Sequence, residues 1–124
     1  MSFKIDLSGP RNLIVITIEG SFSADDFIEI LEQIVNSKDY PSNINAVYDL
    51  TRMSFDNITS GFLQVLNVLA EKYGNARSGA KTAYVCPTDL QFGMARAWEA
   101  FVNEVPIKTM VTRSMDEALS WING

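Results

Sequence analysis

The feature that most constrains the fold of this chain is a regular alternation of two kinds of apolar pattern. Short runs rich in β-branched and aromatic residues, which are typical of strands, occur at residues 3–7, 13–18, 44–50, 81–86 and 106–113. Apolar residues at the three- and four-residue spacing of an amphipathic helix occur at residues 23–35, 56–73, 88–102 and 114–122. The predicted order of elements is therefore ββαβαβαβα.

Three of the predicted helices begin at residues that can cap a helix. Ser23 can accept a hydrogen bond from the first turn of the first helix. Thr88 with Gln91, and Ser114 with Glu117, have the spacing of a capping box, in which two side chains satisfy each other's backbone N–H groups. These signals place the starts of the first, third and fourth helices.

The second predicted helix has the widest apolar stripe. Its apolar residues at helical spacing are Ile58, Phe62, Val65, Leu66, Leu69 and Tyr73, and Leu63 and Val68 widen the stripe. A helix that covers one face of a sheet needs a narrower apolar stripe than this. We therefore expect either a homodimer contact or a helix wedged between the sheet and a neighbouring helix. The helix is expected to end before Gly74 and Asn75, with a left-handed stop.

The connections between the strands predict the sheet. The first two strands are separated only by turn residues at 8–12, so they pair antiparallel. The later strands are joined through helices, so they run parallel with right-handed crossovers. We expect an α/β fold with a single mixed, mostly parallel five-stranded sheet and four helices. The chain has 124 residues and no evident linker or repeat, so residues 1–124 are expected to form one domain.

Charge and hydropathy limit the partners of this domain. The net charge is −5, which gives no electrostatic attraction to nucleic acid or to an anionic membrane. No stretch reaches the roughly 20 apolar residues of a membrane span, and the N-terminus resembles a strand rather than a signal peptide. We therefore expect a cytoplasmic protein that has no nucleic-acid partner and no membrane span.

The residue types needed for most catalytic sites are missing from the sequence. The chain has no histidine and one cysteine, Cys86, which excludes histidine-based triads and the usual zinc sites. Cys86 follows a strand pattern and has no basic neighbour, so it is expected to be a buried, unreactive thiol. The scattered glycines form no phosphate-binding motif. We expect no cofactor, no metal and no enzymatic activity.

Polar residues follow three of the predicted parallel strands. Ligands of open sheets lie beyond the carboxyl ends of such strands, which predicts a ligand rim formed by Asp49, Arg52, Asp89 and Arg113. Two alternatives stay open for these residues. They can be ordinary caps and loop charges, or Asp49, Asp89 and Arg113 can belong to a carboxylate-based enzyme, for which the sequence fixes no nucleophile.

The segment 47–66, Val-Tyr-Asp-Leu-Thr-Arg-Met-Ser-Phe-Asp-Asn-Ile-Thr-Ser-Gly-Phe-Leu-Gln-Val-Leu, resembles the signature of STAS domains. In the anti-sigma-factor antagonists of that family, a strand ending in Asp-Leu-Ser leads into Asp-Ser-Ser-Gly-Leu at a helix start. The order of elements is also similar, over essentially the whole chain. The segments 92–101 and 115–122 further resemble small stand-alone bacterial STAS-like proteins. The resemblance implies a STAS-like fold and a regulatory, non-enzymatic role.

The resemblance also implies a phosphorylation site. In partner-switching members of the family, an anti-sigma factor that is a kinase phosphorylates the first serine of Asp-Ser-Ser-Gly, and the phosphate releases the partner. Alignment on Gly61 places Thr59 at that position, followed by Ser60. Ile58 occupies the position of the family's acid, and Asn57 and Asp56 are the nearest polar substitutes. Thr59 and Ser60 can alternatively be no more than hydroxyl groups of a helix N-terminus.

Two binding functions are consistent with this sequence. The first is docking of a protein partner through Ser54, Phe55, Asp56 and Phe62. Phe55 lies in a loop, so its side chain is expected to be exposed. The second is binding or carriage of a small apolar, lipid-like ligand. The residues that would line its cavity are Leu66, Leu69, Met94, Trp98 and Phe101. Helical spacing also allows all of these side chains to be ordinary core.

Overall fold

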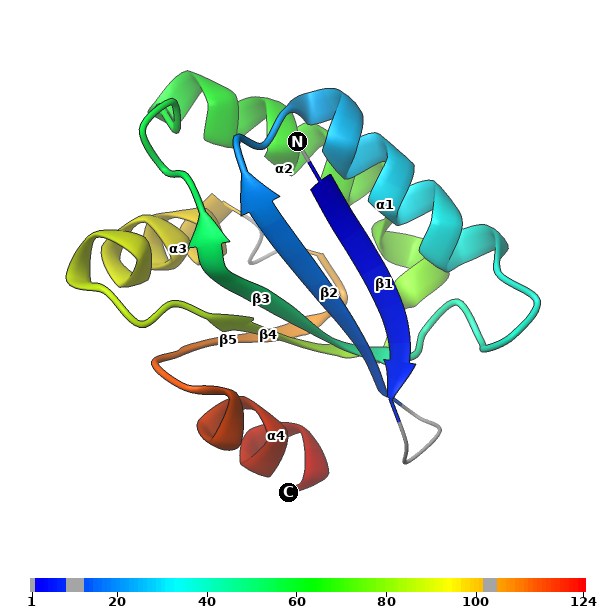
Figure 1. The fold of residues 1–124 in the computed structure, drawn as a ribbon. Helices are drawn as coiled ribbons and strands as arrows, with labels where there is room; N and C mark the ends of the chain where they lie inside the picture. The colour runs from blue at the N-terminus through cyan, green and yellow to red at the C-terminus, as the bar shows by residue number, and fades with distance from the viewer. Residues whose placement is uncertain (1, 9–12, 102–104) are drawn as a thin grey trace.

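The structure is a computed structural model that describes residues 2–8, 13–101 and 105–124 (Figure 1). Its elements are β1 (Ser2–Ser8), β2 (Leu13–Gly20), α1 (Ala24–Asn36), β3 (Asn45–Met53), α2 (Ser60–Gly74), a 3-10 turn η1 (Asn75–Arg77), β4 (Lys81–Val85), α3 (Asp89–Phe101), β5 (Lys108–Thr112) and α4 (Met115–Asn123). This order confirms the predicted ββαβαβαβα arrangement. The predicted turn between the first two strands falls largely outside the described residues.

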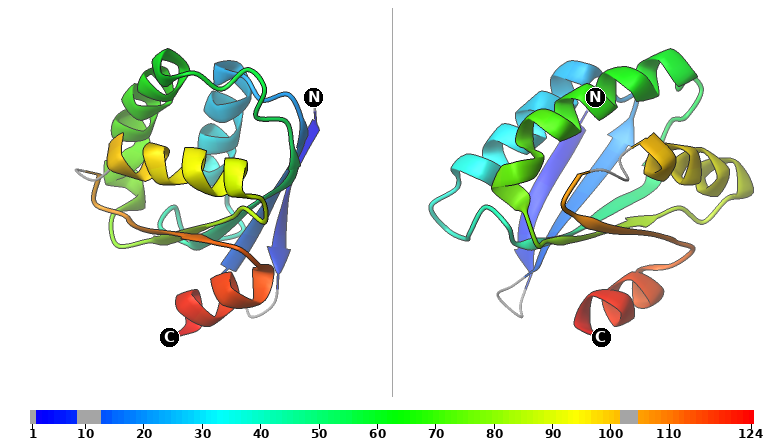
Figure 2. Two further views of the ribbon diagram at one scale, coloured as in Figure 1. Left: turned by 90° about the vertical axis from the view of Figure 1, so that its left-hand side faces the viewer. Right: turned by 180° about the vertical axis from the view of Figure 1, so that it is seen from behind.

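The five strands lie in the sheet in the same order as in the sequence, β1-β2-β3-β4-β5. β1 pairs antiparallel with β2, and the remaining pairs are parallel. Each right-handed crossover therefore steps in the same direction, which places α1, α2 and α3 on one face of the sheet. α4 follows the last strand and covers the opposite face (Figures 1 and 2). The predicted mixed, mostly parallel sheet is confirmed.

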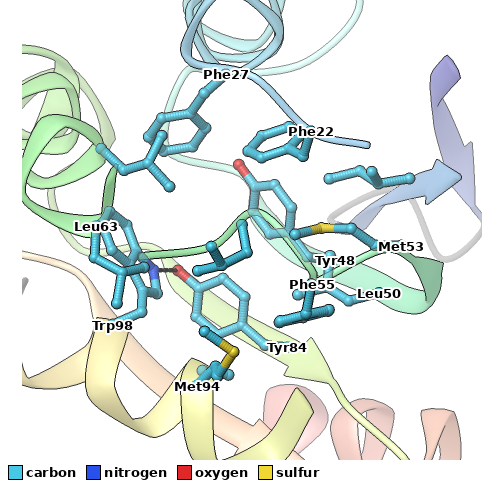
Figure 3. A pocket seen from close by; sticks show the side chains of 14 residues that line it. Phe22, Phe27, Tyr48, Leu50, Met53, Phe55, Leu63, Tyr84, Met94 and Trp98 are labelled. Carbon is cyan, nitrogen blue, oxygen red and sulfur yellow. Dashed lines mark hydrogen bonds between the residues drawn. The ribbon is translucent and has the colours of Figure 1, made fainter. Parts of the chain in front are cut away.

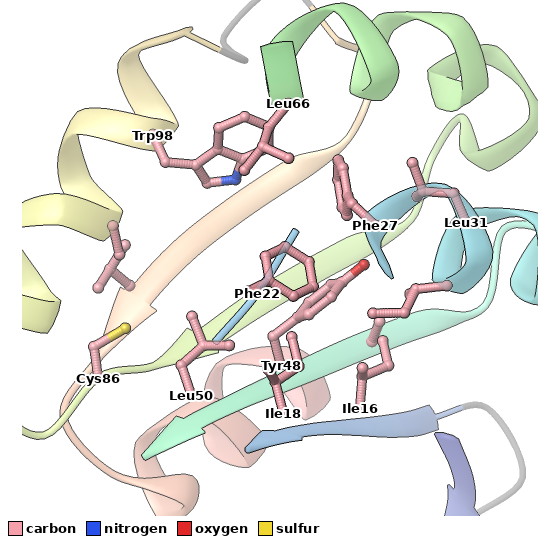
Figure 4. Packing of buried hydrophobic residues seen from close by; sticks show 14 of the residues in the cluster. Ile16, Ile18, Phe22, Phe27, Leu31, Tyr48, Leu50, Leu66, Cys86 and Trp98 are labelled. Atoms are coloured by element: carbon pink, nitrogen blue, oxygen red, sulfur yellow. The ribbon is translucent and has the colours of Figure 1, made fainter. Parts of the chain in front are cut away.

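Two buried clusters hold these layers together. The larger lies between the sheet and helices α1 to α3, and Figure 4 shows Ile16 and Ile18 of β2 within it. Ile14, two residues before Ile16, belongs to the same cluster, as the two-residue period of a strand requires. The smaller lies under α4, where Ala118 and Ile122 pack on strand residues of the other face. Among the described residues, no helix is both long and apolar enough to cross a bilayer.

The predicted helix caps are present. The Ser23 hydroxyl accepts from the Asp26 backbone N–H at 3.1 Å, and the Asp26 carboxylate accepts from the Ser23 N–H at 2.9 Å. Thr88 and Gln91 form the predicted reciprocal box, with both bonds at 3.2 Å. Ser114 caps α4 through the Glu117 N–H at 3.2 Å. Capping chemistry therefore fixes where these three helices begin.

The boundaries of α2 differ from the prediction at both ends. The helix begins at Ser60 rather than near residue 56, because Thr59 is its N-cap and Ile58 N–H closes a turn on the Phe55 carbonyl at 3.1 Å. The predicted left-handed stop at Gly74 is wrong. Gly74 is helical with a φ of −63°, the chain continues into η1, and the positive φ occurs at Gly79, at +89°.

Gly74 is required for a reason other than backbone handedness. A Cβ atom at this position would lie 2.5 Å from Cγ1 of Val105, closer than side chains approach one another. We expect Gly74→Ala to lower the free energy of unfolding by about 1–3 kcal/mol, because the helix or the Val105 segment must shift. Gly93 of α3 has open space around its Cα, so Gly93→Ala should stabilise the protein by up to about 1 kcal/mol. Urea unfolding of the two variants tests this, and equal stabilities would contradict it.

Candidate functional site

Thr59 and Ser60 lie together at the exposed start of α2. The Thr59 hydroxyl accepts a hydrogen bond from the Phe62 backbone N–H at 3.1 Å, and both Thr59 and Ser60 are exposed. α2 has no acidic residue in its first turn. The positive end of the helix dipole therefore faces this pair of hydroxyl groups without a carboxylate from the helix itself. Thr59 is therefore the N-cap of α2, as one of the two interpretations of the sequence predicted, and Ser60 stays accessible to solvent.

The aromatic residues of the predicted docking surface are more buried than expected. The prediction that Phe55 is exposed is wrong, because only 9% of its surface is accessible and it packs in the main core. Ile58, at the position of the family's acid, is also 9% exposed, so an apolar anchor replaces the acid. Phe62 is half-buried against the same core, Ser54 is half-buried, and Asp56 is exposed. The aromatic side chains of the predicted docking surface therefore face inward.

The outer face of α2 carries apolar side chains that the core does not use. Val65 is 48% exposed and Val68 is 63% exposed, while Leu63 and Leu66 are buried. The wide apolar stripe predicted for this helix therefore has two parts, one that faces the core and one that is exposed. Residues three or four apart share a helix face, so Val65 and Val68 continue the surface that begins at Gly61.

Two of the four predicted rim residues form a pair. Nη1 of Arg113 lies 2.8 Å from Oδ1 of Asp89, and its guanidinium carbon lies 4.2 Å from the centre of the Phe92 ring. The same nitrogen donates to the Pro87 carbonyl at 3.3 Å. Arg113 therefore ties the end of β5 to the start of α3, and Asp89 sits in the first turn of that helix, where the dipole favours an acid.

The other two rim residues have separate partners. Asp49 Oδ1 accepts from the Thr51 backbone N–H at 3.1 Å, and Arg52 Nη1 lies 4.0 Å from the Glu19 carboxylate on β2. Ligand crevices in open sheets form where the strand order reverses, and the order of the described strands does not reverse. Each rim residue thus has a structural partner, and the topology provides no crevice among them.

Cys86 lies at the end of β4 and is completely buried. Burial raises the pKa of its thiol to about 12, which keeps it protonated and unreactive near neutral pH. Among the residues that the structure describes, no group of three or more histidine, cysteine, aspartate or glutamate side chains has the arrangement of a metal site.

An apolar cavity of about 70 Å³ lies between the sheet and helices α2 and α3 (Figure 3). Its walls come from β2, α1, β3, α2, β4, α3 and the loops that precede α1 and α2: Ile18, Phe22, Phe27, Tyr48, Leu50, Met53, Phe55, Ile58, Leu63, Leu66, Tyr84, Met94, Ala95 and Trp98. Three residues predicted to line a carrier cavity, Leu66, Met94 and Trp98, are among them. Leu69 packs against the core outside this lining, and the side chain of Phe101 lies outside the described residues.

Two tyrosines and a tryptophan supply the polar atoms of this cavity. The Tyr48 and Tyr84 rings stack with centres 5.4 Å apart, and Trp98 Nε1 donates to the Tyr84 hydroxyl at 2.9 Å (Figure 3). Burial raises the pKa of Tyr48 to about 12 and raises that of Tyr84 further. Both phenols are therefore neutral hydrogen-bonding groups at physiological pH.

These shifts predict a loss of stability in alkali. Phenols and thiols in the unfolded chain ionise near pH 10 and 8.5, whereas Tyr48, Tyr84 and Cys86 stay protonated in the fold to about pH 12 or above. The unfolded state thus binds fewer protons than the native state, and stability falls as pH rises from about 9 towards 12. Each group contributes up to about 1.4 kcal/mol per pH unit. Urea unfolding across this range measures the slope, and Tyr48→Phe should flatten it; an unchanged slope would contradict the assignment.

A second cavity, of about 40 Å³, lies beneath the C-terminal half of α2 and η1. It shares Phe27, Tyr48, Tyr84 and Trp98 with the first cavity, and it is otherwise lined by Leu31, Ala70, Tyr73, Gly74, Arg77, Thr82, Val105, Ile107 and Thr109. Arg77 is 3% exposed, and its Nη1 and Nη2 donate to the carbonyls of Ser42 and Ile44 at 2.8 and 3.0 Å. Burial lowers the pKa of this guanidinium.

Comparisons with known proteins give the family from one search and the fold from another. The structure is similar to the crystal structure of an uncharacterised protein of the DUF3478 family with a SpoIIAA-like fold from Shewanella loihica PV-4. The TM-score is 0.65 at 19% identity, over 98% of this chain and 92% of that one. No curated protein gave a significant match. The model of the SpoIIAA-like family matches residues 13–123. The chain therefore belongs to the SpoIIAA-like family.

Proposed function

We propose that this protein is a non-enzymatic regulatory module of the STAS type that binds a protein partner and is switched by phosphorylation of Thr59. The observation that carries the proposal is the position of Thr59. Thr59 is exposed as the N-cap of α2, and alignment on Gly61 matches it to the serine that is phosphorylated in partner-switching proteins of the STAS type. A kinase-like anti-sigma factor is the corresponding class of partner.

The docking surface that we propose starts at the phosphorylated residue. Asp56, Thr59 and Ser60 are exposed at the helix start, and Val65 and Val68 extend the exposed face by two turns. A partner that covers this face buries the two valines and approaches the hydroxyl closely. A phosphate on Thr59 stays compatible with the helix, because the N-terminal dipole favours negative charge, but its bulk and charge oppose docking.

Three variants of Thr59 separate the cap from the switch. Thr59→Ser keeps both the cap and a hydroxyl that a kinase can modify, whereas Thr59→Asn keeps only the cap, since asparagine is an equally good N-cap. Tagged proteins recovered gently from the native host are compared by mass spectrometry. We expect phosphate on the wild type and on Thr59→Ser, and Thr59→Asn should retain its partner permanently. Ser60→Ala is the matched control and should behave as the wild type.

Two results would contradict the proposal. The first is the same set of co-purifying proteins with the wild type and with Thr59→Asn under conditions in which the wild type is phosphorylated. The second is a chain recovered without phosphate and without a partner.

The cavity favours a second candidate function, the binding of a small ligand. Its lining is almost wholly apolar, and it contains three of the residues that the carrier hypothesis named. A cavity of about 70 Å³ is smaller than the ~150 Å³ cavity that holds one benzene molecule, so a long lipid chain does not fit within it. Any ligand of this site is therefore small.

A further inference from the structure

The two cavities lie one after the other beneath α2. The larger is under the first half of the helix, at Leu63 and Leu66, and the smaller is under its end, at Gly74 and Arg77. Four aromatic side chains, Phe27, Tyr48, Tyr84 and Trp98, belong to the walls of both. A ligand that extends along α2 therefore passes these rings, with an apolar environment at one end and a guanidinium at the other.

Arg77 is a buried charge without an acidic partner among the described residues. The ion pairs between described residues involve other cations, namely Lys4, Arg52, Arg96 and Arg113. The two carbonyl bonds of Arg77 use two of the five N–H donors of the guanidinium. A buried charge needs compensation, and the other three donors have no partner among the described residues. An arginine with such donors next to a cavity is suited to a planar carboxylate.

Tyr48 offers a second donor at the junction of the two cavities. It is 7% exposed, and its hydroxyl points toward Phe27 and Leu31 of α1 (Figure 4). The hydrogen bonds of this region link Trp98 to Tyr84 and Thr109 to Glu99, and among the described residues none includes the Tyr48 hydroxyl. A neutral phenol in this place can donate to a ligand oxygen.

We propose that the two cavities bind one short-chain monocarboxylate, with its carboxylate between Arg77 and Tyr48 and its apolar chain against Leu63, Leu66 and Trp98. This inference rests on the second candidate function above. The single guanidinium of Arg77 matches one carboxylate, because its planar N–H donors suit the two carboxylate oxygens. The small volumes restrict the apolar chain to a few carbons.

Fluorescence of Trp98 reports on the proposed site. The chain has two tryptophans, so Trp121→Phe leaves Trp98 as the only strong emitter. Trp98 lines both cavities, and a ligand that joins them must contact it. We would titrate this variant with straight-chain carboxylates from acetate to octanoate and with the 1-alcohols of equal length. We expect saturable changes that are strongest for chains of intermediate length, and at least tenfold weaker binding of each matching alcohol.

Arg77→Met then tests the carboxylate end. This variant should bind carboxylates and alcohols equally, because it retains the apolar end of the site. Tyr48→Phe serves the same purpose if Arg77→Met does not fold, and it should weaken carboxylate binding several-fold while it leaves alcohol binding unchanged. Equal binding of carboxylates and alcohols by the unaltered site would overturn this inference and leave the second candidate function standing. No saturable change with any probe would overturn both.

Discussion

Replacing Trp98 with alanine is expected to lower the free energy of unfolding by about 3–5 kcal/mol. Trp98 is 8% exposed, packs edge-to-face against Phe27 with ring centres 5.9 Å apart, and donates its indole N–H to Tyr84. Because it lines both cavities, its removal would merge them into one larger space, and the cost of such a substitution rises with the volume left empty. Equilibrium unfolding in urea measures this loss.

A conservative variant separates the two contributions of this side chain. Trp98→Phe keeps an aromatic ring in the space but removes the hydrogen bond to Tyr84, so we expect a loss of about 1–2 kcal/mol. A change within about 0.5 kcal/mol for Trp98→Ala, the range of surface substitutions, would show that the packing around these cavities is not as described.

Phe55→Ala is expected to cost about 3 kcal/mol of stability although Phe55 lies in a loop. Its ring forms part of the cavity wall, and the turn from Phe55 to Ile58 leads directly to the cap of α2. The loss therefore has two sources, which are buried apolar area and the position of the helix start. Asp56→Ala is the matched control, because Asp56 is the exposed neighbour in the same loop, and its effect should stay within about 0.5 kcal/mol.

This pair of variants also distinguishes two accounts of the loop. If Phe55 were an exposed anchor for a partner, its truncation would weaken docking and leave the unfolding free energy unchanged. If it is part of the core, truncation lowers stability without a partner present. Equal stabilities of Phe55→Ala and Asp56→Ala in urea would favour the first account and contradict the structure.

The fold could be predicted from the sequence because its signals are local. β-branched runs, helical spacing and the capping pairs at Ser23, Thr88 and Ser114 act within a few residues of one another. The order of strands and helices then leaves few arrangements once crossovers must be right-handed. The start of α2 was not predicted in this way, since the apolar spacing placed it near residue 56 and only the family resemblance put Thr59 at a helix start.

The positions of Phe55, Gly74 and Arg77 could not be predicted, because contacts distant in the sequence determine them. A phenylalanine in a polar loop is normally predicted to be exposed, but Phe55 packs as part of the cavity wall. Val105 packs so closely on Gly74 that a side chain there would clash with it, and the donors of the buried Arg77 reach the carbonyls of Ser42 and Ile44. No local pattern marks any of these three contacts.

On the function proposed here, phosphate on Thr59 and a bound partner exclude each other. The most direct test is the phosphate occupancy of Thr59 in two pools of the protein from its native host, one eluting with a partner and one eluting free. We predict an unmodified Thr59 in the bound pool and a phosphorylated Thr59 in the free pool. Equal occupancy in the two pools, or phosphate confined to another residue, would contradict the claim.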